Sequence, residues 1–149
     1  GEDSFRKVFT VWTSKLFLVN ETIHENPFNT NYFAWIDISI PRHNRDNKLY
    51  TQDYLPNKLF HFGNMMKYYG ETITINASFL IAHKNIWKIL MPLYEKQLQL
   101  SKNSKYAHDE ETILYLIWKD NKDLFCDIKN MNKTNFESAK KVCRYENKT

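Results

Sequence analysis

The stretch Tyr32-Phe33-Ala34-Trp35-Ile36-Asp37-Ile38-Ser39-Ile40 decides the fold that we expect for this chain. It is a nearly continuous apolar run of strand length, and Pro41 follows it directly. Runs of this kind are typical of strands that are covered on both faces, as in parallel sheets. We therefore expect a buried strand here, with Asp37 near its carboxyl end. A lone buried carboxylate is costly, so Asp37 needs a compensating partner.

The segments on either side of this strand predict an α/β order. Upstream, apolar residues at helical spacing allow one helix from Phe5 onward, but we favour a shorter helix over 15–25 that Thr13 or Ser14 caps, with 5–12 partly extended. Asn26-Pro27 ends that helix. Downstream we expect a long loop over 42–70 with one short helix at 58–68, a strand over 72–82, helices over 85–100 and 108–120, and a short strand at 124–128.

This order describes one α/β domain over 1–128, followed by a polar tail over 129–149. The chain enters the pattern midway, so we expect earlier strands to be missing or to come from another chain.

The composition excludes several classes of function. Only 3 glycines are present, and neither a dinucleotide-binding glycine motif nor a P-loop occurs. The net charge of +4 comes from 21 basic and 17 acidic residues that are interspersed, so we expect no nucleic-acid partner. No apolar run reaches the roughly 18 residues that a membrane span needs.

Asp37 is the first candidate for chemistry. Ligands of open α/β sheets bind outside the carboxyl ends of the strands, where a carboxylate can hold a metal bound to phosphate. Mg²⁺ or Mn²⁺ prefers such oxygen ligands. The alternative is a structural aspartate that caps a loop or pairs with Arg42.

The acidic run Asp109-Glu110-Glu111 is the second candidate. Acids at the start of a helix are explained by the helix dipole alone. In the functional interpretation, one of them points into a cleft as a base or binds a hydroxyl group. The histidines are dispersed, which makes zinc chemistry unexpected.

Two cysteines, Cys126 and Cys143, can close a short loop through a disulfide in an oxidising compartment. Asn20 and Asn132 begin N-x-S/T sequons and are candidate glycosylation sites. Together these features favour the secretory pathway or an extracellular location.

Several motifs resemble the HtrL/YibB family, which is glycosyltransferase-like. They are Trp12-Thr13-Ser14-Lys15, Asn26-Pro27-Phe28, the Trp35-Ile36-Asp37 run, Asp109-Glu110-Glu111 and Leu124-Phe125. The resemblance covers roughly residues 10–128 and is most specific around Asp37.

This resemblance implies a partial GT-A-type fold, with a mixed sheet flanked by helices, and a nucleotide-sugar donor with a glycan or protein acceptor. Asp37 would bind Mn²⁺ or Mg²⁺ near the diphosphate, and Arg42 would neutralise phosphate. Asp109 or Glu110 would face the acceptor. Trp35 is a candidate substrate contact, although tryptophans of this kind are more often core residues.

A second hypothesis is a non-catalytic module that binds a glycan or a protein, for example as part of a larger assembly. Ser39 stands where the family pattern has glycine, and the strand over 72–82 also lacks the glycines that the resemblance leads us to expect. The expected absence of the donor-binding segment favours the same hypothesis.

Overall fold

The computed structural model describes residues 2–37, 55–68, 70–102 and 109–128. The elements follow in the order α1 (Glu2–Glu25), β1 (Tyr32–Ile36), β2 (Leu59–Tyr68), β3 (Glu71–His83), α3 (Lys84–Lys102), α4 (Glu110–Asp120), the 3-10 turn η2 (Lys122–Leu124) and β4 (Phe125–Ile128). The α/β class expected from the sequence is confirmed.

The sheet is mixed and has four strands in the order β1-β3-β2-β4. The central strand β3 is antiparallel to both of its neighbours, β1 and β2, whereas β4 runs parallel to β2. Gly70, which precedes β3, has a φ of +82°. Such left-handed backbone favours glycine because glycine has no Cβ.

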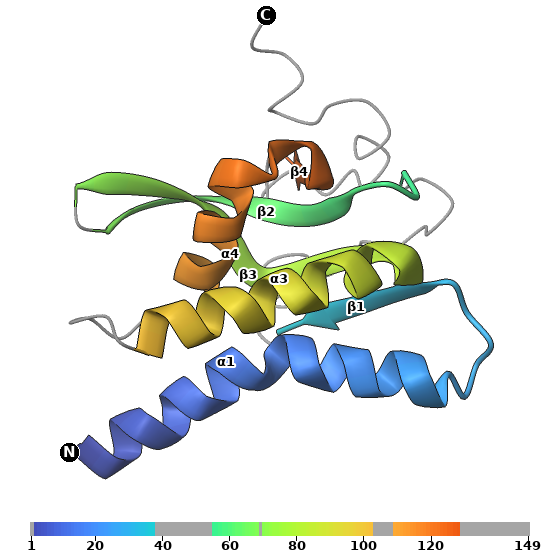
Figure 1. Cartoon of the computed structure of the whole chain (residues 1–149), viewed down its shortest axis with the longest axis horizontal. Helices are drawn as coiled ribbons and strands as arrows, with labels where there is room; N and C mark the ends of the chain where they lie inside the picture. Colours follow the sequence, from blue (N-terminus) through green and yellow to red (C-terminus); the bar gives the residue numbers. More distant parts are fainter. Residues whose placement is uncertain (1, 38–54, 69, 103–108, 129–149) are drawn as a thin grey trace, which may run out of the picture.

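One main core lies between the sheet and the helices α1, α3 and α4, which gather on the same side of the sheet (Figure 1). Apolar side chains of the helices repeat every three to four residues and meet alternate residues of the strands. The core includes Leu16, Val19 and Ile23 of α1, Ile75 and Leu80 of β3, Trp87 and Leu90 of α3, and Ile113, Leu114 and Ile117 of α4.

The strand β1 is not covered on both faces, so that expectation was wrong. Among the described residues it pairs only with β3, and it does so antiparallel. Phe33 and Trp35 turn toward the main core, whereas Ala34 and Ile36 are exposed. The continuous apolar run therefore does not show here that both faces are buried.

Two helix expectations were also wrong. The helix α1 is continuous from Glu2 to Glu25, so Thr13 and Ser14 lie inside it and do not cap its start. Their hydroxyl groups donate instead to the carbonyls of Phe9 and Val11 in the preceding turn. The segment 58–68, expected as a helix, is the strand β2. The end of α1 before Asn26-Pro27 and the expected strand over 72–82, helices over 85–100 and 108–120 and strand at 124–128 are confirmed by α1, β3, α3, α4 and β4. Most of the long loop expected before β2 lies outside the described residues.

A bulge in β3 shapes the surface on which the candidate site lies. The neighbours His61 and Phe62 of β2 are in register with Leu80 and Asn76, so no β2 residue lies opposite 77–79. A bulge leaves backbone groups without ladder partners, and bulges are frequent next to active sites. The bulge therefore leaves the N–H of Ala77 to a side chain from another part of the chain, whereas the carbonyl of Ser78 faces the end of β1 and accepts from Asp37.

The expected tail over 129–149 lies outside the described residues. Within the part of the chain that the structure describes, no helix has both the length and the apolar character needed to cross a bilayer.

Candidate functional site

Asp37 follows directly after β1 and is fixed there by its backbone and its side chain. Its N–H donates to the carbonyl of Ser78 in the β3 bulge at 2.8 Å. Its Oδ1 accepts a 2.6 Å hydrogen bond from Nε1 of Trp35, which lies two residues earlier on the same face of the strand. The carboxylate is one-third exposed, so it remains open to solvent at the end of the strand.

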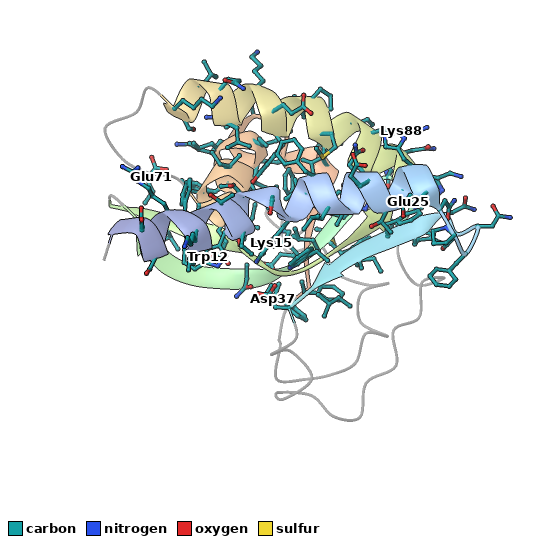
Figure 2. All side chains as sticks on the ribbon, turned by 90° about the horizontal axis from the view of Figure 1, so that it is seen from below. Trp12, Lys15, Glu25, Asp37, Glu71 and Lys88 are labelled. Carbon is teal, nitrogen blue, oxygen red and sulfur yellow. The ribbon has the colours of Figure 1, made fainter. Side chains whose placement is uncertain are left out.

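Lys15 of α1 is the partner of this carboxylate. Its Nζ lies 3.3 Å from Oδ1 of Asp37 and 2.6 Å from Oε1 of Glu110. The same ammonium group lies 5.6 Å from the centroid of the Trp35 ring, within the range of a cation–π interaction. Figure 2 shows Lys15 on α1 beside Asp37 at the end of β1. We call Lys15, Asp37 and Glu110 the ion-pair centre.

The ion-pair centre joins three elements that are far apart in the sequence. Only 6% of the side chain of Lys15 and 6% of that of Glu110 are exposed. In such a desolvated setting the loss of one charge leaves its partner uncompensated, which is more costly than the loss of an exposed ion pair. The centre therefore ties α1 to the end of β1 and to the start of α4.

Asp109 lies at the start of α4 and contacts the first turn of that helix. It is the N-cap of α4, and its Oδ1 accepts hydrogen bonds of 2.8 Å from both the N–H and the hydroxyl group of Thr112. This is the usual contact of an N-cap side chain with the first turn. Capping of α4 therefore accounts for the position of Asp109. Glu110, the next residue, is the acid that pairs with Lys15 in the ion-pair centre.

Glu111 occupies the β3 bulge. Its Oε1 accepts a 3.0 Å hydrogen bond from the N–H of Ala77, one of the backbone groups that β2 leaves without a ladder partner. Burial raises the pKa of Glu111 to about 7, and the nearby charges of Asp109 and Glu110 add to the rise, although the Ala77 N–H and Lys15 oppose it. A carboxyl group with a pKa near 7 can accept and return protons at neutral pH.

Tyr94 of α3 holds the helices together beside these acids. Its hydroxyl group donates to the carbonyl of Thr13 at 3.1 Å. Burial, followed by the charges of Glu110 and Asp109, raises the pKa of Tyr94 far above its usual value. It is therefore a neutral hydrogen-bond donor that fixes α1 against α3, one half-turn before Lys15.

The residues around Asp37 fit a divalent cation poorly. Oδ1 of Asp37 already interacts with Trp35 and with the ammonium group of Lys15, and Glu110 is held by the same ammonium group. Among the described residues, no group of three or more His, Cys, Asp or Glu side chains could hold a metal ion. Binding of Mn²⁺ or Mg²⁺ by Asp37 stays a prediction.

The structure describes only some of the remaining candidates from the sequence. Arg42, Asn132 and Cys143 lie outside the described residues. Asn20 is half-buried within α1. Cys126 is buried in β4, and its expected disulfide with Cys143 stays a prediction.

Sequence reasoning assigned no role to Lys15, although a signal was present. Lys15 lies four residues before Val19 and next to Leu16, so it falls on the apolar stripe of α1. Residues four apart share one helix face. A lysine on a buried stripe needs an acidic partner.

Comparison with family models, curated proteins and solved structures finds no match to this chain.

Proposed function

We propose that this chain carries part of a sugar-transfer site of the GT-A type, in line with its resemblance to the HtrL/YibB family. The observation that carries the proposal is the meeting of Asp37, at the end of a strand, with the first-turn acids of α4 across the β3 bulge. A strand-end carboxylate beside acids at a helix start is the combination that such a site needs to orient a donor and an acceptor.

In this proposal Glu111 accepts the proton of the acceptor. The acceptor hydroxyl group gives its proton to the Glu111 carboxylate while its oxygen bonds to the anomeric carbon of the donor sugar. The bond between that carbon and the diphosphate oxygen breaks, and its electron pair leaves with the nucleoside diphosphate. Glu111 is suited to this role because burial raises its pKa to about 7, close to neutral pH.

Calorimetric titration with a panel of nucleoside diphosphates and nucleotide-sugars tests the proposal. Asp37→Asn keeps the shape of the side chain, and the exposed Asp120 at the end of α4 provides the control variant Asp120→Asn. We expect the wild type and the control to bind with similar affinity. The affinity of Asp37→Asn should be at least about tenfold lower, which corresponds to a loss of about 1.4 kcal/mol in binding free energy. Equal binding by Asp37→Asn and the wild type would contradict a donor site at Asp37.

The second candidate is a non-catalytic module that binds a protein or a glycan. It is favoured by exposed apolar side chains along α1, where Val8, Val11, Trp12, Phe17 and Leu18 are each more than one-third exposed. Exposed apolar patches mark interaction sites in many proteins. If the nucleotide panel does not bind at all, titration with oligosaccharides and a test of self-association are the next measurements. The secretory or extracellular location stays a prediction.

A further inference from the structure

We infer that the ammonium group of Lys15 takes the place that the resemblance assigns to a divalent cation, so that the site at Asp37 works without Mn²⁺ or Mg²⁺. The inference concerns the charge balance of the site and rests on the proposed function for its biological meaning. Its evidence, however, lies in the contacts of the ion-pair centre alone.

The ammonium group of Lys15 occupies the position that a bridging cation would take. Nζ of Lys15 lies between the two carboxylates that the sequence singled out, 3.3 Å from Asp37 and 2.6 Å from Glu110. A divalent cation that bridged a strand-end aspartate and a helix-start glutamate would have to occupy the same region. The charge that such an ion would supply is already provided by the protein.

A metal ion bound to Asp37 would lie close to the ammonium group of Lys15. Metal–oxygen distances for Mg²⁺ are about 2.1 Å, so an ion on Oδ1 of Asp37 would lie within about 5.5 Å of Nζ. Two like charges at that distance in a partly buried site repel each other strongly. Oδ1 also accepts the short hydrogen bond from Trp35, which leaves little room for another ligand.

The side chain of Lys15 is buried and held in place. The side chain is 6% exposed, its ammonium group faces the Trp35 ring, and the backbone of its helix is fixed to α3 through Tyr94. Lys15 cannot move away to admit an ion without leaving a buried charge uncompensated. It is therefore a fixed cation that positions Asp37 and Glu110.

Titration of the full chain with MnCl₂ alone, followed by the electron paramagnetic resonance signal of free Mn²⁺, tests the inference without a donor. The variants are Lys15→Met, Asp37→Asn, Lys15→Met/Asp37→Asn and the control Lys88→Met, in which an exposed lysine of α3 is replaced. The wild type and the control should bind Mn²⁺ no tighter than about 1 mM, the weak limit of built protein sites. Lys15→Met should gain one site at least about tenfold tighter, and the double variant should lose it.

Tight binding of one Mn²⁺ by the wild type that Asp37→Asn abolishes would overturn the inference. A folded Lys15→Met variant that gains no Mn²⁺ site would also overturn it. If Lys15→Met does not fold in buffer, its thermal unfolding is measured with and without Mn²⁺. We then expect Mn²⁺ to raise the unfolding temperature of Lys15→Met but not that of the Lys88→Met control. If Mn²⁺ does not stabilise Lys15→Met, the inference is contradicted. Because no nucleotide is present, none of these outcomes depends on whether the chain binds a sugar donor.

Discussion

Glu111 on α4 accepts a hydrogen bond from the main-chain N–H of Ala77, in the segment of β3 that bulges away from β2. The two residues are 34 positions apart, and their contact closes the gap that the bulge opens in the hydrogen-bond ladder. The Glu111 carboxylate accepts the Ala77 N–H here, whereas in the regular ladder a backbone carbonyl of a neighbouring strand accepts such a group. The start of α4 is thus fixed to β3 by Glu111 and to α1 by Glu110.

The raised pKa of Glu111 predicts that the stability of the chain falls between about pH 4.5 and pH 7. The ordinary value is 4.5 and the value in the fold is about 7, so the folded state binds the proton more tightly than the unfolded chain does. The stabilisation is complete below pH 4.5 and is lost as the pH rises through 7. The difference corresponds to at most about 3 kcal/mol.

Urea unfolding of the wild type and of Glu111→Gln at a series of pH values measures this effect. The amide oxygen of glutamine can still accept from Ala77 but does not titrate, so the variant should gain stability relative to the wild type as the pH rises. The difference between the two proteins also removes the contribution of the histidines, which both contain. A constant difference from pH 4 to pH 8 would show that Glu111 titrates normally.

Replacement of Lys15 by methionine should be the most destabilising single change at the centre. It leaves the carboxylates of Asp37 and Glu110 facing each other without a cation, at a cost of about 3 to 5 kcal/mol for a buried pair. The exposed Lys88 is the control, and Lys88→Met should change the free energy of unfolding by less than about 0.5 kcal/mol. Similar losses in the two variants would mean that the ion-pair centre contributes little to stability.

Asp109 should behave as a helix cap. Asp109→Ala removes the acceptor for both Thr112 contacts and should cost about 1 kcal/mol, whereas Asp109→Asn should cost much less because asparagine also caps well. Thermal unfolding monitored by circular dichroism compares the two variants. If Asp109→Asn were as damaging as Asp109→Ala, the negative charge rather than the cap would matter.

The hydroxyl group of Tyr94 should contribute through its bond to the Thr13 carbonyl. Tyr94→Phe keeps the buried ring and removes only this donor, which should lower the free energy of unfolding by about 1 kcal/mol. The exposed Lys88 again supplies the control, since Lys88→Met should leave stability nearly unchanged. No loss in Tyr94→Phe, measured by urea unfolding, would show that solvent replaces this bond.

The sequence predicted the elements whose pattern is regular and whose ends carry strong signals. Alternation over 72–82 gave β3, and Asn26-Pro27 correctly ended α1. It failed at 58–68 because an aromatic and polar run has no clear period, and the pairing of β2 with β3 and β4 comes from distant residues. It also failed at Thr13 and Ser14, whose hydroxyl groups bond within a helix as readily as at its start.

For the candidate site, the sequence identified Asp37 and the acids of α4 but not what joins them. A single sequence does not show which lysine meets two carboxylates, or that β3 leaves the Ala77 N–H to a side chain. Both facts depend on how α1, β3 and α4 pack. The position of Lys15 on the apolar stripe of α1 predicts an acidic partner, but which acids it meets, and the contact of Glu111 with Ala77, follow from the three-dimensional arrangement.

The bulge in β3 also makes one backbone proton a spectroscopic sensor of the site. A hydrogen bond to an ionised carboxylate is shorter and stronger than one to its neutral form, so the Ala77 amide resonance should move as Glu111 loses its proton. Amides in the regular ladder of β1 and β3 donate to carbonyl groups, which do not titrate. A single peak in a nitrogen–proton correlation spectrum would thus follow the protonation of a buried acid directly, even before any substrate of this chain is known.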